Sequence, residues 1–249
     1  MQWQDTGFVL AARRHGESAL IVELLTREHG RHAGLVRGGQ SPKARALLQP
    51  GNEVAAVWRG RLDEHLGIIT CELVRAHAAR FLDDPGRLAG LTSAAALVTG
   101  ALPEREPHAG VFLSFARLIE ALDSSIDWPV HYVKWELDLL GALGFALDLS
   151  RCAVSGVRID LAYVSPRTGR AVSRAAGLPY QDKLLSLPEF LWCDTPADEV
   201  QLALGMTLTG YFLTHHVFAP QSRTLPAARI RLAERMRQMA AITGQQTPD

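Results

Sequence analysis

The chain has 249 residues, enough for one large domain or two ordinary ones. Hydrophobic residues make up 47% and charged residues 21%, close to the average of soluble globular proteins, so a sizeable core is available. The formal net charge is zero, so the global charge points to no class of partner.

The charge is unevenly distributed along the chain. Residues 1–80 contain eleven Lys and Arg against eight Asp and Glu, a net charge of +3. Residues 81–222 contain ten against sixteen, a net charge of −6, and residues 223–249 return to +3 with five against two. Local electrostatics should therefore matter more than the total.

The cysteines and the N-terminus point to a reducing compartment. Cys71, Cys152 and Cys193 are odd in number, widely spaced and without a CxxC pair, which argues against a disulfide framework. The start of the chain lacks a secretory pattern, and no window reaches about 18 uninterrupted apolar residues. We expect a cytoplasmic protein with no transmembrane helix and no membrane partner.

The first eighty residues are predicted to form short strands, because apolar and β-branched residues recur with period two between turn residues. Ser41 and Pro42 predict one short helical turn, with Ser41 as N-cap. Five strands with a helical piece between the third and fourth match an OB-fold, and an SH3-like barrel is the nearest competitor. The expected strands are residues 6–14, 18–26, 31–37, 53–58 and 66–73.

Basic residues gather where an OB-fold holds oligonucleotides, on the middle strands and their loops. Arg31 and Arg37 are six residues apart, so on a strand they would share a face, as would Arg59 and Arg61. A merely solvated surface is the alternative. The candidate nucleic-acid contacts are Arg13, Arg14, Arg31, Arg37, Gln40, Lys43, Arg45, Arg59 and Arg61.

Aromatic and histidine side chains are few in this region. Phe8 and Trp58 could stack on bases, although core positions are favoured for both. His15, His29 and His32 lie near two turns and are expected to be exposed there.

From about residue 75 the pattern becomes helical. Residues 150–177 interrupt it with a turn-rich segment and one hairpin, formed by residues 161–164 and 170–172. We therefore predict an α+β chain with a barrel over residues 1–80 and a helical domain over residues 81–249, with 150–177 as an insertion. The expected helices are residues 77–82, 88–102, 111–122, 130–143, 182–192, 197–217 and 226–242.

Catalytic and cofactor motifs are missing. The sequence has no GxxxxGK[ST], GxGxxG, GxSxG or HExxH. Cys152, Cys193, His215 and His216 are too scattered to predict a metal site. No catalytic residue, cofactor or metal is expected, and an enzyme is disfavoured.

Several segments match a known family in order and spacing. They are GFVLAARRHGESALIVELLTREHGRHAGLVRG from residue 7, SPKARALLQPG from 41, WELDLLGALGFALDLSRC from 135, LAYVSPRTGRAVSRAAGLPY from 161, and Ser222-Arg223 before the last helix. Each is unspecific alone, but together they run nearly end to end. The chain resembles the RecO family of bacterial DNA repair and recombination proteins.

The resemblance implies a fold and a set of partners. It implies an N-terminal OB-fold, a helical domain with a zinc-finger-like insertion, binding of single- and double-stranded DNA, and annealing of complementary strands. It also implies contact with RecR and with the acidic C-terminal tail of the single-stranded DNA-binding protein, so that RecA is loaded at gaps. Such a protein would be cytoplasmic and nucleoid-associated.

The partner tail would need an apolar pocket rimmed by Arg or Lys. Regions near Arg117, near Lys134 and along residues 223–237 are the open alternatives. Arg223, Arg229 and Arg231 are candidate partner or DNA contacts in the last of these.

The sequence departs from the family pattern in one place. Some members carry two CxxC pairs in the insertion, whereas here Cys152 is followed by Ala, Val and Ser155, and residues 169–173 hold no cysteine. We therefore predict a zinc-finger-like element without zinc, held by its hairpin and apolar packing.

Two other functions remain open from the residues alone. The barrel could be an RNA-binding module of translation or ribosome assembly, or the chain could be a protein-interaction scaffold whose basic loop is only solvated.

Overall fold

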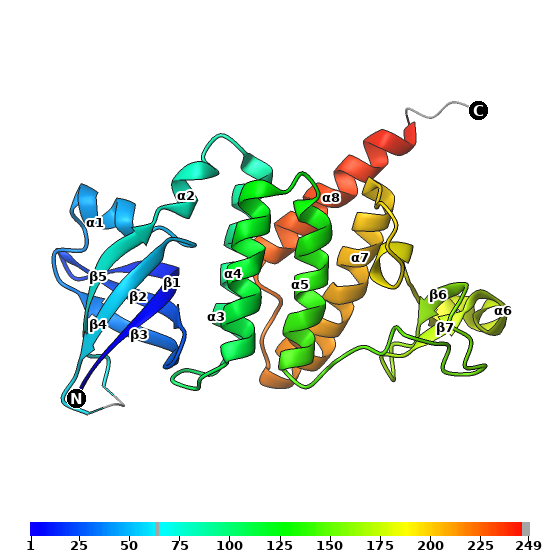
Figure 1. Cartoon of the computed structure of the whole chain (residues 1–249), viewed down its shortest axis with the longest axis horizontal. Helices are drawn as coiled ribbons and strands as arrows, with labels where there is room; N and C mark the ends of the chain where they lie inside the picture. The colour runs from blue at the N-terminus through cyan, green and yellow to red at the C-terminus, as the bar shows by residue number, and fades with distance from the viewer. Residues whose placement is uncertain (63–64, 246–249) are drawn as a thin grey trace. The chain divides into compact units, whose positions relative to one another are not determined.

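The structure is a computed structural model that describes residues 1–62 and 65–245 (Figure 1). The chain divides into two compact units, Met1–Ile126 and Asp127–Asp249. The described residues of the first unit contain the strands expected for residues 1–80 together with four helices. The domain boundary expected at residue 80 stays a prediction.

A closed five-stranded barrel begins the first unit (Figure 1). Its strands are β1 (Gln2–His15), β2 (Ala19–Thr26), β3 (Gly30–Val36), β4 (Glu53–Arg59) and β5 (Ile68–Arg75). They pair in the order β1-β2-β3-β5-β4, and β4 returns to β1. The OB-fold prediction is confirmed.

Strand β1 closes the barrel because it pairs with two neighbours. Its residues from Gln2 to Phe8 pair with β4, and those from Gly7 to His15 pair with β2. The register shifts between Val9 and Ala11, where a bulge bends the strand. The barrel core includes Val22 and Trp58, both with no exposed surface.

The helical turn between β3 and β4 forms as the sequence predicts. Helix α1 (Pro42–Leu47) begins after Ser41, whose hydroxyl accepts a hydrogen bond from the Ala44 N–H. Behind it, the Asn52 side chain donates to the carbonyls of Ala46 and Leu47 at 3.0 Å. This side chain fixes the end of α1 against the start of β4.

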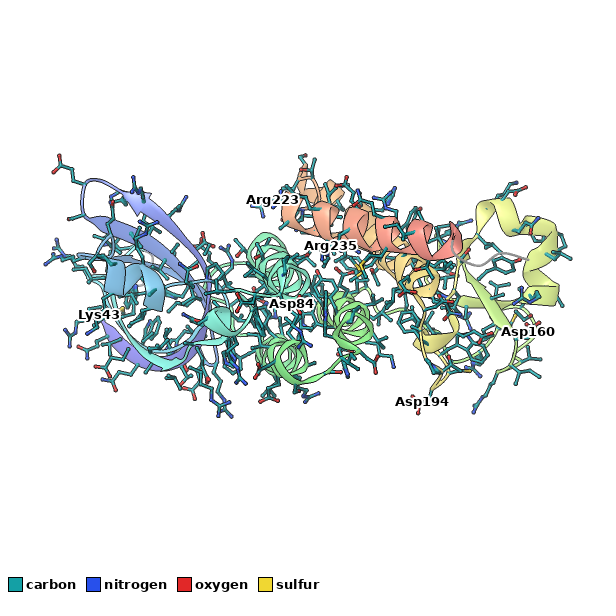
Figure 2. The ribbon with its side chains drawn as sticks, turned by 90° about the horizontal axis from the view of Figure 1, so that it is seen from above. Lys43, Asp84, Asp160, Asp194, Arg223 and Arg235 are labelled. Atoms are coloured by element: carbon teal, nitrogen blue, oxygen red, sulfur yellow. The ribbon has the colours of Figure 1, made fainter. Side chains whose placement is uncertain are left out.

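Three helices complete the first unit: α2 (His77–Arg80), α3 (Pro85–Ala101) and α4 (Ala109–Ser124). Asp84, labelled in Figure 2, caps α3 by accepting from the N–H groups of Gly86 and Arg87 at 3.0 Å. The Phe8 ring of β1 contacts two rings of α4, Phe112 at 5.4 Å and Phe115 at 5.5 Å between centroids. Phe8 is therefore a core residue, which is the position that the sequence favours.

The second unit is built on α5 (Trp128–Ala142), α7 (Glu199–Phe212) and α8 (Ala227–Gln245). A π-helical turn, η3 (Leu213–Phe218), and a short 3₁₀ turn, η4 (Ala219–Gln221), extend α7. Helix α7 packs against both α5 and α8. The insertion contains β6 (Leu161–Val164), β7 (Ala171–Ser173) and α6 (Arg174–Gly177), so the predicted hairpin is confirmed.

The prediction of a helix over residues 182–192 was wrong. Two 3₁₀ turns, η1 (Leu178–Lys183) and η2 (Glu189–Leu191), flank a short strand, β8 (Leu185–Ser186). Strand β8 joins the hairpin as a third strand beside β6. Pro188 explains the difference, because a proline disfavours helical backbone at the preceding residue. The Leu187 N–H instead donates to the Ala162 carbonyl at 2.9 Å.

A buried ion pair ties the helices of the second unit together. Arg229 of α8 is 1% exposed, and its Nη2 donates to Glu136 Oε2 of α5 at 2.9 Å. The same nitrogen donates to the Met206 carbonyl at 2.7 Å, and the Thr209 hydroxyl donates to Glu136. Every charge of this pair thus has several partners, which a buried ion pair requires to be tolerated.

Replacing Arg229 by Ala should destabilise the protein by about 3–5 kcal/mol, because it leaves the Glu136 carboxylate buried without its counter-charge. Urea unfolding followed by circular dichroism measures this. Arg231→Ala, at an exposed position on the same helix, is the matched control and should change stability by less than about 0.5 kcal/mol. Equal stability of the two variants would contradict the role of the pair.

Candidate nucleic-acid interface

One end of the barrel carries a cluster of cations from three separate segments. Arg14 on β1 lies opposite Leu20 of β2, and Leu20 lies opposite Val36 of β3, so Arg37 follows at the same end. Helix α1 follows the turn after β3 and carries Lys43, which Figure 2 labels. We call this surface the basic end, formed by Arg13, Arg14, Arg37, Gln40, Lys43 and Arg45.

Gln40 joins two segments of the basic end, the loop after β3 and the β1–β2 turn. Its side-chain amide donates to the carbonyls of Gly16 and Ala19 at 3.0 and 3.3 Å. Its backbone N–H donates to the Ser18 carbonyl at 3.1 Å. The loop after β3 is therefore fastened to the β1–β2 turn, and Gln40 positions the surface.

A shallow cavity of about 200 Å³ lies within the basic end. Arg14, Gln40 and Arg45 line it together with Leu20 and Leu48, and no carboxylate does. All five cations of the basic end are exposed, and among the residues that the structure describes none of them forms an ion pair with an acid. Glu17 in the neighbouring turn is the nearest acid along the sequence.

Arg31 lies elsewhere and is engaged inside the first unit. Its Nη1 contacts Glu23 Oε2 at 2.9 Å and Glu104 Oε1 at 3.4 Å, and its Nε donates to the Leu102 carbonyl. Only 12% of its side chain is exposed. The expected common face with Arg37 was wrong, because Arg37 lies beyond the end of β3, in a turn where the strand alternation no longer applies.

Arg59 and Arg61 lie at the opposite end of β1 from Arg14. Arg59 pairs in register with Gln2, and its Nε donates to the Gln2 side-chain oxygen at 3.0 Å. Arg61 follows in the β4–β5 loop and is exposed. The predicted set of contacts therefore divides into the basic end, this second pair, and the internally bound Arg31.

The three arginines singled out near the C-terminus also differ in their placement. Arg223, labelled in Figure 2, is exposed before α8, and Arg231 is exposed on it. Arg229 is the core residue of the buried ion pair and presents no guanidinium to a partner. Sequence alone could not separate the three, because α8 has arginines on both its buried and its exposed faces.

Sequence reasoning missed an aromatic cluster beside Arg59. The Trp3 ring stacks on His29 with 4.3 Å between centroids, and the buried His32 ring meets Trp3 edge-on at 5.0 Å. His32 is therefore not the exposed turn residue that was expected, and His29 is half-buried. Strand β1 starts at Gln2, before the expected residue 6, and alternation read back to Gln2 would have included Trp3.

Comparison with known proteins decides the family. The family model described as "Recombination protein O N terminal" matches residues 1–77, and "Recombination protein O C terminal" matches residues 82–225. The chain belongs to the RecO family of DNA repair proteins.

Individual RecO relatives align with nearly the whole chain. "DNA repair protein RecO" of Rhodospirillum centenum is 51% identical over 246 residues, which cover 98% of each chain. The protein of the same name from Rhodospirillum rubrum is 51% identical over 97% of this chain and 98% of its own. That of Phenylobacterium zucineum is 51% identical over 95% and 98%. None of the helices in the described residues is long and apolar enough to cross a membrane.

The insertion of this RecO family member does not present a donor set that fits zinc. Cys152 is buried, and its sulfur accepts hydrogen bonds from the Ser155 N–H at 3.5 Å and the Ser173 hydroxyl at 3.4 Å. Burial raises the pKa of this thiol, but the hydrogen bonds outweigh burial and lower the pKa to about 6. No group of three metal-ligating side chains gathers among the described residues, whereas structural zinc takes four ligands.

Backbone hydrogen bonds connect the parts of the insertion. The N–H groups of Cys152 and Ala153 donate to the carbonyls of Val157 and Ala171 at 2.7 and 2.8 Å. The Arg174 N–H donates to the Asp160 carbonyl at 2.8 Å. These bonds join the loop to the hairpin and to α6.

The purified protein should contain far less than one zinc per chain, and chelator should leave its melting temperature unchanged, because hydrogen bonds and packing hold the insertion. Metal analysis by mass spectrometry and thermal unfolding with and without chelator measure both quantities. A stoichiometry near one zinc per chain would contradict this prediction.

Proposed function

We propose that the protein is a DNA-binding recombination mediator, in which the basic end holds the phosphate backbone of single- and double-stranded DNA. The observation that carries the proposal is a set of exposed cations that form no ion pair within the described residues, two segments of which Gln40 joins, the β1–β2 turn and the loop after β3. Membership of the RecO family supports DNA as the anion. Arg59 and Arg61 extend the DNA contact at the opposite end of β1.

Contacts of this kind are electrostatic and do not depend on the base sequence of the DNA. Each neutralised phosphate releases counterions, so the affinity should fall steeply as the salt concentration rises. Phosphate contacts position a protein on DNA without reading its sequence, which suits a mediator that acts at any gap or break.

Strand annealing follows from the same physics. Two complementary strands repel each other through their phosphates, and a cationic surface that holds both lowers this repulsion while the bases remain free to pair. Annealing, and help in loading RecA on DNA coated with single-stranded DNA-binding protein, complete the proposed activity. No catalytic step is part of it.

The proposed protein partners are RecR and the acidic C-terminal tail of the single-stranded DNA-binding protein. One stripe of α8 supports a site for the tail, because Arg231, Arg235, Met239 and Ile242 are all exposed at helical spacing. An acidic and apolar peptide needs such a mixture of cations and apolar side chains. Figure 2 labels Arg235 within this stripe.

Reversing two charges of the basic end tests the DNA surface. Arg37→Glu combined with Lys43→Glu should weaken binding of a single-stranded oligonucleotide about tenfold or more at low salt. The negative slope of log affinity against log salt should become shallower by about 1 to 1.5, because fewer phosphates are contacted. Fluorescence anisotropy across a salt series measures both quantities.

The matched control reverses Arg27 and Arg117, which are exposed elsewhere on the first unit, and so has the same net charge. It should bind far more tightly than the double variant of the basic end. Equal losses in both proteins would mean that net charge, and not this surface, determines binding.

An annealing assay separates the proposed mediator from the other functions. The protein should accelerate pairing of complementary DNA oligonucleotides and should bind both single-stranded DNA and the single-stranded DNA-binding protein. A strong preference for RNA of the same sequence would favour the RNA-binding module of translation or ribosome assembly. Binding of the protein partner without any nucleic acid would favour the scaffold.

A further inference from the structure

A cavity of about 540 Å³ lies at the end of the barrel opposite the basic end. It is lined by Met1, Gln2, Trp3, Glu28, His29, His32, Arg105 and Pro107. The volume lies within the range of about 300–1,000 Å³ typical of small-molecule sites. All of these residues belong to the first unit, and none was among the expected contacts.

Three nearly parallel rings lead from the core to this cavity. Trp58 is fully buried, and Trp3 lies 5.9 Å from it with an angle of 10° between the ring planes. His29 lies 4.3 Å from Trp3 at 12°, and 32% of its side chain is exposed. Exposure therefore increases along the series, and the imidazole is its outermost ring, at the cavity.

The His29 ring is held in place and does not move freely on the surface. Its Nδ1 lies 3.1 Å from Asp5 Oδ2, and the Asp5 carboxylate is nearly buried. The same carboxylate accepts from the Glu28 N–H at 2.8 Å, and the His29 N–H donates to the Thr26 hydroxyl. A flat ring with a fixed orientation is a suitable platform for a second flat ring.

Arg105 supplies a cationic donor at the wall of the cavity. Its backbone has a φ of 63°, which is uncommon for a residue other than glycine, and its N–H donates to the Arg31 carbonyl at 2.7 Å. Its Nη2 donates to the His65 carbonyl, but its Nε is buried and has no hydrogen-bond partner among the described residues. A buried donor without a partner is costly, so a ligand acceptor beside it is favoured.

Further cations lie on a segment that contacts two lining residues of the cavity. Gln2 lines the cavity and accepts from Arg59, and the Met1 amino group donates to the Gly60 carbonyl at 2.8 Å. The segment that carries Arg59 and Arg61 is therefore fastened beside the aromatic rings. Stacking rings next to cations that track a backbone are what single-strand binding sites combine.

We propose that this cavity binds one unpaired nucleobase of single-stranded DNA, stacked on the exposed face of His29, with Arg59, Arg61 and Arg105 at the flanking phosphates. The inference rests on the proposed DNA binding and adds a base-binding subsite to it. A duplex cannot offer such a base without unpairing it. Because only one base is held, its neighbours remain free to pair.

A fluorescent base analogue tests the subsite directly. The probe is a single-stranded oligonucleotide with one 2-aminopurine flanked by abasic positions, so that quenching comes from the protein and not from neighbouring bases. At saturating protein the fluorescence should fall at least about twofold, since stacking quenches the probe. His29→Ala should remove most of this quenching and weaken binding about fivefold, the low end of base–aromatic stacking.

Two control variants separate the subsite from the rest of the DNA surface. His29→Phe keeps a flat ring at the position and should retain the quenching. The Arg37→Glu, Lys43→Glu variant should saturate the probe only at a higher protein concentration. At saturation it should quench the probe's fluorescence to the same extent as the unchanged protein. Blunt duplex DNA should bind His29→Ala and the unchanged protein about equally.

A crosslink removes the dependence on the folding of His29→Ala. A 5-iodouracil at the probe position, irradiated in complex with the unchanged protein, should attach to His29 or Trp3. Trypsin releases His29 in the peptide Glu28–Arg31, which mass spectrometry identifies.

The outcomes distinguish the two proposals. If the oligonucleotide does not bind at all, the proposed function fails. If it binds, but quenching is equal in His29→Ala or crosslinks form only at residues outside the cavity, the base-binding subsite is wrong and DNA binding stands.

Discussion

Closure of the barrel through one long strand is the constraint on which the candidate surfaces depend. Strand β1 pairs with β4 over its first half and with β2 over its second half, and the bulge between Val9 and Ala11 lets it turn from one partner to the other. Without that bend the sheet would remain open, with unpaired N–H and C=O groups at its edges. The candidate surfaces lie at the two ends of β1, beside the β1–β2 turn at one end and the end of β4 at the other.

Pairing with acids distinguishes the cations of this chain more clearly than their position in the sequence. Arg31 and Arg229 each satisfy their guanidinium groups inside their own unit, whereas Lys43 and Arg45 are exposed on the short helix α1 and form no ion pair within the described part of the chain. The first group stabilises the fold, and the second is available to an external anion. An exposed cation contributes little to stability, so binding is the role that remains for the second group.

Much of the barrel could be predicted from the sequence because its signals are local. Period-two alternation and the Ser41-Pro42 pair depend on neighbouring residues, and both gave the right elements. The internal contacts of Arg31 could not be predicted, because its partners Glu104 and Leu102 lie some seventy residues away along the chain. The prediction for Leu185–Ser186 was wrong for a related reason, because these residues form a strand only through pairing with β6. The aromatic cluster was missed because stacking of Trp3 on His29 joins β1 to the turn between β2 and β3.

The two ends of β1 are chemically unlike, and this gives the barrel a direction. Gln2 and Arg14 are twelve residues apart, a separation of at most about 40 Å along a strand. Single-strand sites on OB-folds cover roughly 4–16 nucleotides, so one bound strand can extend from one end to the other. Because the 5′ and 3′ directions of a nucleic acid are not equivalent, a purely cationic end and a ring-stacking end would accept the strand in one orientation. The barrel would then impose a polarity on the strand it holds without reading any of its bases.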